Sequence, residues 1–116
     1  GMVKVFNVGS GECVMTVENL AFPLGLAFNC CGKLLVSEEE AHRVSVWDDK
    51  GALVRVIGIF GVGDEDGQLS LPFDVAVNGD GDVIVIDESC QIQIFREDGR
   101  FVMSFKVEDD GSREPE

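Results

Sequence analysis

Short apolar runs recur along the chain, and residues that favour turns separate them. The clearest example lies between Leu71 and Lys106. There, residues 75–77 and 83–86 are almost continuously apolar, whereas residues 91–95 and 101–105 alternate between apolar and polar. Continuous runs are typical of strands covered on both faces, and alternation is typical of strands with one buried face. We therefore predict a four-stranded antiparallel unit in which burial falls from the first strand to the fourth.

The same pattern occurs a second time between Pro23 and Gly58. Pro23 corresponds to Pro72, Asn29 to Asn78 and Trp47 to Phe95. The first residues of the chain match only the last two strands of the unit. Internal repeats of this length with four strands each predict propeller blades. We expect an all-β partial β-propeller of about two and a half four-stranded antiparallel blades, divided into an outer hairpin of an incomplete blade (1–17), two blades (18–58 and 59–106) and a disordered acidic tail (107–116).

Charge narrows the classes of partner. The chain has 9 Lys and Arg against 22 Asp and Glu, a net charge of −13. Binding to nucleic acid depends on basic residues that displace counterions from phosphates, so nucleic acid is disfavoured. A solvated surface explains the acids more simply than a site for a basic partner. The sequence has no apolar stretch of the length of a membrane span, and we expect no membrane contact.

The four cysteines do not follow a metal-binding spacing. Cys13, Cys30, Cys31 and Cys90 include no CxxC pair, and His42 is the one histidine. Zinc sites usually need such pairs, so we expect no metal and no cofactor. Reduced thiols in the cytoplasm are the expected state, because adjacent cysteines rarely form a disulfide with each other. By their position in the repeat, Cys30 and Cys31 are predicted to be turn residues.

The last repeat carries six features in a fixed order: the Gly, Asp and Gln of the lead-in (63–68), Pro72 with the apolar run after it, the Asp80-Gly81 turn, Asp87 at a strand end, residues 92–95, and Asp98-Gly99 before Phe101. With these features it resembles an NHL repeat, the blade unit of NHL-type β-propellers. The resemblance implies a noncatalytic scaffold for protein binding, in a parent of the TRIM-NHL kind that can carry a RING or B-box domain. It also implies a structural pair between Glu38 and Arg43 across a turn.

Candidate functional residues are few. His42 is interpreted as an exposed turn residue, not as a catalytic base, and Trp47 as a packing residue. The acids before Gly67 could suggest a calcium loop, but the full ligand pattern is absent and a solvated turn is favoured. We expect no catalytic residue, and place protein binding on loop residues at the blade ends: Glu39, Glu40, His42, Asp64, Glu65, Asp66 and Glu88.

Two other functions remain open at this stage. One is a propeller hydrolase or lyase with a divalent metal in the central channel, which requires acids or histidines from several blades. The other is RNA binding, which the resemblance to some NHL proteins implies. RNA binding requires a basic face on the loops, and the scattered Lys and Arg residues do not indicate one. Exposed blade edges also predict self-association of an isolated segment.

Overall fold

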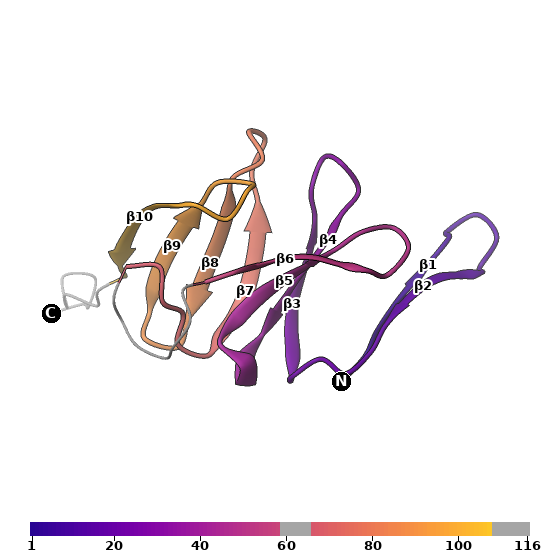
Figure 1. Cartoon of the computed structure of the whole chain (residues 1–116), viewed down its shortest axis with the longest axis horizontal. Coiled ribbons are helices and arrows are strands. Elements are labelled where there is room, and N and C mark those ends of the chain that lie inside the picture. The colour runs from indigo at the N-terminus through magenta and orange to yellow at the C-terminus, as the bar shows by residue number, and fades with distance from the viewer. Residues whose placement is uncertain (59–65, 108–116) are drawn as a thin grey trace, which may run out of the picture.

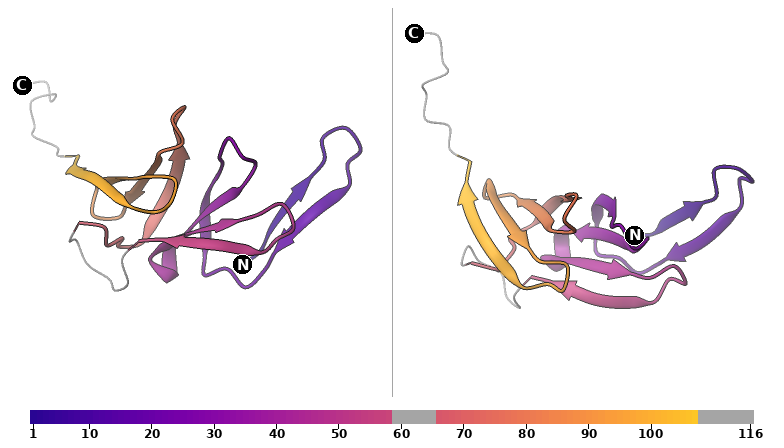
Figure 2. Two further views of the ribbon diagram at one scale, coloured as in Figure 1. Left: turned by 45° about the horizontal axis from the view of Figure 1, so that its top comes forward. Right: turned by 90° about the horizontal axis from the view of Figure 1, so that it is seen from above.

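A computed structural model describes residues 1–58 and 66–107. It contains a two-stranded hairpin and two four-stranded antiparallel sheets, arranged side by side along an arc (Figures 1 and 2). The hairpin is β1 (Val3–Phe6) and β2 (Cys13–Val17). The predicted all-β partial propeller is confirmed. The predicted disordered tail from residue 107 lies outside the described residues except for Val107.

Each sheet is a meander of four consecutive strands. The first blade consists of β3 (Pro23–Phe28), β4 (Leu34–Glu38), the short 3₁₀ helix η1 (Glu39–Ala41), β5 (Arg43–Trp47) and β6 (Leu53–Ile57). The second consists of β7 (Pro72–Val77), β8 (Val83–Asp87), β9 (Gln91–Phe95) and β10 (Phe101–Lys106). The inner strands β3 and β7 lie next to each other.

The three outer hairpins share one irregularity. Between the outer two strands of each unit, one valine on the last strand is left out of the pairing register: Val14, Val54 and Val102. Each of these valines follows a turn glycine with positive φ, namely Gly11, Gly51 or Gly99. An extra residue of this kind is a β-bulge, which increases the local twist. The hairpin at the start of the chain is thus built like the outer half of the two complete blades.

Two apolar layers hold the units together. The larger lies between the blades and includes Leu35, Val44, Val75, Val85 and Phe95. The smaller joins the hairpin to the first blade through Val17, Leu34 and Val36, with Trp47 packed against it. Trp47 and Phe95, which the repeat aligns, therefore fill the same position in successive layers.

The predicted burial gradient is wrong. β4 is buried at every position, whereas β3 and β7 are partly exposed along their length. The second strand of the first blade is covered by the hairpin on one face and by the second blade on the other. The first strand is an edge of its sheet, so fewer neighbours cover it. Apolar side chains are about half exposed in two places: Leu26 and Phe28 on the inner strand β3 near β1, and Met103 and Phe105 on the outer strand β10.

The segment that leads into the second blade is less exposed than the sequence suggested. The Gly and acidic residues between Gly58 and Leu71 predict a surface connection from the outer strand of one blade to the inner strand of the next. Residues 59–65 lie outside the described part. In the described part, Leu69 is fully buried in the layer between the blades, and the backbone of Gly67 is buried against Gln93. The prediction is wrong for these residues. The chain has to pass from the outer strand β6 of the first blade to the inner strand β7 of the second blade, and it packs against the layer between the blades on the way.

Candidate binding surfaces at the blade ends

The turns of the two blades form two rims. The lower rim, at the bottom of Figure 1, carries η1 and the β8–β9 turn. The upper rim carries the turns β3–β4, β7–β8 and β9–β10. The β5–β6 turn belongs to the same end of its blade but projects sideways toward the first hairpin in Figure 1. Because successive turns of a meander alternate between its ends, residues far apart in sequence gather on the same rim. The two rims are the surfaces on which a partner would meet loop side chains.

Glu38 and Arg43 face each other across the lower rim. The Nε atom of Arg43 lies 2.9 Å from Oε2 of Glu38, and Oε1 of Glu38 accepts a hydrogen bond of 3.0 Å from the backbone N–H of Ala21. The Glu38 side chain is 1% exposed. Burial on its own would raise the pKa of Glu38, but hydrogen bonds from Ala21, Ser45 and Arg43 hold the pKa below its ordinary value. The pair thus fixes the turn and the residues that precede β3.

Asp87 occupies the equivalent place in the second blade. Its Oδ2 accepts a hydrogen bond from the backbone N–H of Ser70 at 3.1 Å, as Glu38 does from Ala21. Its Oδ1 accepts bonds from the N–H and the hydroxyl of Ser89. Gln91 stands where the first blade has Arg43, and its Oε1 is buried without a hydrogen-bond partner among the described residues. The anchoring carboxylate is kept, and serine replaces arginine as its side-chain donor.

His42 connects the two blades. It is half-buried and adopts a left-handed conformation (φ 55°) after η1. Its Nδ1 accepts a hydrogen bond of 3.1 Å from the backbone N–H of Leu71, which also has a positive φ. His42 is therefore a turn residue, as predicted, but the prediction that it is exposed is wrong, because the second blade partly covers it. Its Nδ1 atom accepts the hydrogen bond that links the two blades.

The structure separates the other predicted loop residues. Glu39, Glu40 and Glu88 lie on the lower rim, with Glu40 and Glu88 exposed. Asp66 is exposed beside β10, where its Oδ1 accepts a hydrogen bond of 2.9 Å from the Ser104 hydroxyl. Asp64 and Glu65 lie outside the described residues. The lower rim thus presents acidic side chains from both blades.

A charged cleft on the upper rim was not predicted. It has a volume of about 470 Å³ and lies where β6 of the first blade meets two turns of the second. Arg96 lies 3.3 Å from Asp82, Arg100 lies 3.0 Å from Asp98, and Arg55 donates a hydrogen bond to the Asp98 carbonyl. Its lining residues carry both charges: Arg55, Asp80, Asp82, Arg96, Glu97, Asp98 and Arg100.

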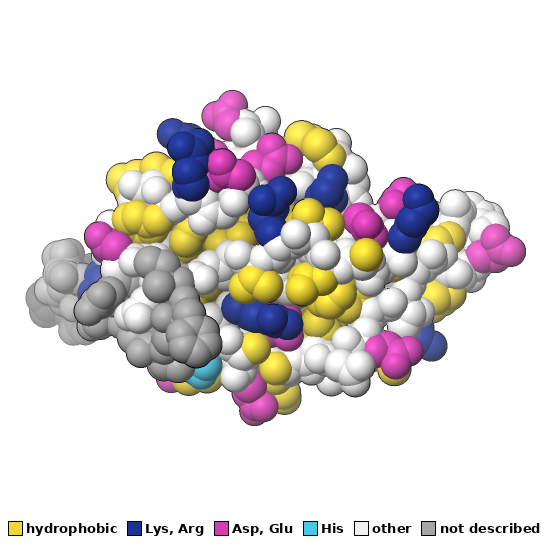
Figure 3. Space-filling view, in the orientation of Figure 1, with side chains coloured by type: hydrophobic (Ala, Val, Ile, Leu, Met, Phe, Trp, Pro, Cys, Tyr) yellow, Lys and Arg dark blue, Asp and Glu magenta, His cyan; other side chains and the backbone are white. Residues whose placement is uncertain are grey.

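The surface shows the same mixture of charges. In Figure 3, most of the basic side chains on this face lie in its upper half, others lie lower, and acidic side chains accompany several of them. The dense charged run from Arg96 to Arg100 was the signal in the sequence that could have pointed to the upper cleft. The contribution of Arg55, from the other blade, had no such signal. The buried hydrogen bond between Gln93 and the backbone of Gly67 was also missed, because a glutamine in a strand of alternating pattern is expected to be exposed.

Comparison with known proteins supports the fold and the repeat. No protein-family model matches the chain. The chain is 32% identical over 104 residues to "Protein brain tumor" of Drosophila melanogaster, a match that covers 87% of this chain and 10% of that protein. The chain therefore spans about a tenth of the length of this curated relative.

Solved structures agree on the architecture. Virginiamycin B lyase of Staphylococcus aureus superposes with a TM-score of 0.71 at 13% identity, over 97% of this chain and 36% of that one. A protein of unknown function from Bacteroides caccae gives 0.67 at 18% identity, over 91% of this chain and 38% of that one. These similarities define a β-propeller. Together with the repeated motif and the curated relative, they show that the chain is built of NHL-type repeats.

Proposed function

We propose that this chain is part of a noncatalytic NHL-type propeller that binds a protein partner through its blade-end loops. The observation that carries the proposal is the upper cleft, to which the first blade contributes Arg55 and the second blade contributes charged side chains of both signs. Arg96 and Arg55 contact an acid and a carbonyl of a neighbouring turn, and Arg100 pairs with Asp98 of its own turn. Preordered charges lose less conformational freedom on binding, and complementary charges select the partner. A protein segment with both acidic and basic side chains fits this cleft.

The charge distribution supports a protein partner over RNA. Three arginines line the cleft, but four acids lie among them, and the lower rim is acidic. A phosphate backbone would meet carboxylates at most of its contacts. The parent propeller is proposed to be cytoplasmic, in keeping with the expected reduced cysteines.

The arrangement of acids supports a noncatalytic role over a metal-dependent hydrolase or lyase. A metal in the central channel needs acids or histidines on several inner strands. Among the described residues, β3 and β7 contribute one acidic side chain, Asp74, and no histidine. Its Oδ1 accepts a hydrogen bond from the backbone N–H of Val75. Likeness to virginiamycin B lyase, at 13% identity, concerns the fold alone.

The test is a selection of random displayed peptides on the purified chain, followed by affinity measurements on variants. Exchanging Arg96 and Arg100 together for Glu is expected to weaken binding of the selected peptides by about tenfold or more, or about 1.4 kcal/mol. The matched control changes Lys4 and Lys50 to Glu, which alters the net charge equally outside the cleft. Peptides that bind both variants equally, or binding of single-stranded RNA alone with a steep salt dependence, would contradict the proposal.

A further inference from the structure

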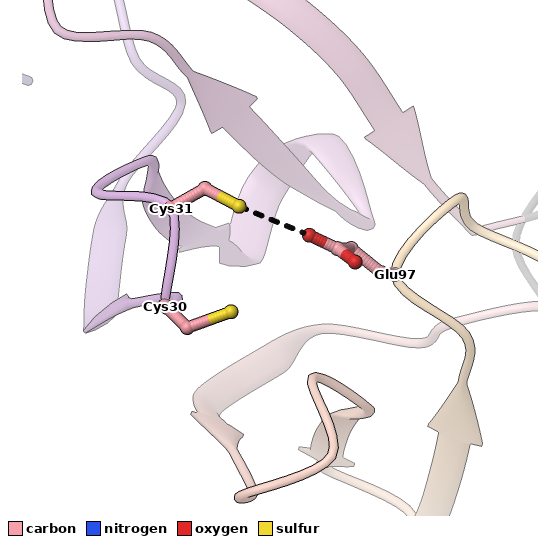
Figure 4. A group of neighbouring side chains, drawn as sticks. All are labelled: Cys30, Cys31 and Glu97. Atoms are coloured by element: carbon pink, nitrogen blue, oxygen red, sulfur yellow. Dashed lines mark hydrogen bonds between the residues drawn. The ribbon is translucent and has the colours of Figure 1, made fainter.

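The upper rim brings together three metal-ligating side chains from the two blades. Cys30 and Cys31 belong to the β3–β4 turn, and Glu97 belongs to the β9–β10 turn. One ligand atom from each of these residues lies within 4.8 Å of the other two, and all three side chains are exposed. Figure 4 shows both sulfur atoms on the side of their turn that faces Glu97. We propose that this cluster is a zinc site that joins the two blades.

The distances suit a single tetrahedral ion. Zinc binds thiolate sulfur at about 2.3 Å and carboxylate oxygen at about 2.0–2.2 Å, so neighbouring ligand atoms around it are about 3.5–3.8 Å apart. Sγ of Cys31 and Oε2 of Glu97 are 3.8 Å apart. The three ligand atoms lie within 4.8 Å of one another, so they would have to approach by about 1 Å to reach this geometry.

The local backbone holds the two cysteines in place. Oδ1 of Asn29 accepts hydrogen bonds from the backbone N–H groups of Cys31 and Lys33, at 3.0 and 2.9 Å. Gly32 supplies the positive φ, 80°, that closes the turn. In an extended strand, adjacent side chains point to opposite faces, but in this turn they share a side. The equivalent turn of the second blade has Gly79 and Asp80 instead, so the site is specific to this junction.

The ligand set selects the ion by its chemistry. Two thiolates and one carboxylate suit zinc better than magnesium or calcium, which prefer oxygen alone. Binding exchanges the protons of both thiols for one Zn²⁺ and releases two H⁺. Affinity should therefore increase as the pH rises. A water molecule would fill the fourth position, since the cluster is open to solvent.

The test uses the full chain, reduced and freed of metal, and titrates it with Zn²⁺ against a chromophoric chelator. We expect one equivalent to bind, and Co²⁺ in its place to give the ultraviolet charge-transfer band of a thiolate ligand. Cys30→Ser, Cys31→Ser and Glu97→Gln should each weaken binding by at least about tenfold, since even groups behind the ligands contribute that much. Circular dichroism should be unchanged, because all three side chains are exposed.

Two matched controls make the result specific. Asp80→Asn removes an equal charge from the same rim, and the double variant Cys13→Ser with Cys90→Ser removes the other two thiols, which are also exposed. Both should bind zinc as the unaltered chain does. The proposal is overturned if zinc is not bound, if Co²⁺ binds without a thiolate band, or if either control loses binding as strongly as the cysteine variants.

Discussion

His42 of the first blade and Leu71 of the second are joined by a hydrogen bond of 3.1 Å, from the backbone N–H of Leu71 to Nδ1 of His42. Both residues have left-handed backbone conformations, with φ of 55° and 51°. Positive φ is costly for residues other than glycine and persists only where the surroundings enforce it. This contact therefore ties two strained turns together at the blade interface.

Replacing His42 with Ala should lower the free energy of unfolding by about 1–3 kcal/mol, because the partly buried N–H of Leu71 loses its acceptor. His42→Asn is the control, since Asn tolerates a left-handed conformation and offers a side-chain carbonyl. It should lose less stability than His42→Ala. Urea denaturation measures both. Equal losses would mean that the hydrogen bond itself contributes nothing.

Glu38→Gln should destabilise the chain by about 1–3 kcal/mol at neutral pH, because the buried Arg43 contact loses its charge. The pKa of Glu38 is lowered in the folded state. Its contribution should therefore be fully present above about 4.3, the ordinary Glu pKa, and be lost as the pH falls through the lower folded value. Urea denaturation at several pH values should show the difference between Glu38→Gln and the unaltered chain shrinking in that range. The exposed Glu40→Gln should change stability by less than about 0.5 kcal/mol.

Gly25→Ala should destabilise the chain by about 1–3 kcal/mol through overpacking between the blades. A Cβ at Gly25 would lie 2.7 Å from Cα of Asp74 and 2.9 Å from Oγ of Ser37. The backbone of β7 cannot yield without shifting the second blade. Gly79→Ala is the matched control, because nothing lies within 4 Å of its added Cβ. Thermal melting of the two variants should separate them, and a neutral Gly25→Ala would show that the blades have room to move apart.

Gln93→Leu should cost about 2–5 kcal/mol, because two buried backbone groups would lose their partners. Oε1 of Gln93 accepts a bond from Gly67 N–H and Nε2 donates to the Gln68 carbonyl, both at 2.6 Å. Gln91 lies two residues earlier on the same face, and its Oε1 has no partner among the described residues. Gln91→Leu should therefore be neutral or stabilising. If Gln91→Leu lowered the stability more than Gln93→Leu, the role assigned to the two hydrogen bonds of Gln93 would be contradicted.

The isolated chain is expected to self-associate through its exposed sheet faces, as the sequence suggested. Met103 and Phe105 pair with Ile94 and Ile92 on the outer face of the second blade and are about half exposed. Exchanging both for Lys should shift the chain toward the monomer in analytical ultracentrifugation. A monomeric unaltered chain at high concentration would refute self-association.

The repeat itself determined the fold class. Strands, turns and bulges depend on residues close together in sequence, so Asn29 and Asn78 make the same turn and the three outer valines the same bulge. The apolar run at residues 83–86 also indicated that Val83 and Val85 are buried. In β9, by contrast, the alternation pointed to Ile92 and Ile94, whereas the structure buries Gln91, Gln93 and Phe95. The turns and bulges follow from local backbone preferences, which the amino-acid sequence carries directly.

Tertiary structure decided which loops meet. The bond of His42 to Leu71, the hydrogen bond of Gln93 with Gly67 and the approach of Cys31 to Glu97 join residues that are 29, 26 and 66 positions apart. The stacking of one blade on the next sets these contacts. It also reversed the expected burial order, because β4 gains neighbours on both faces while β3 remains an edge. The order of apolar and polar residues in the sequence indicates which face of a strand is apolar. The packing of whole sheets against each other determines what covers that face.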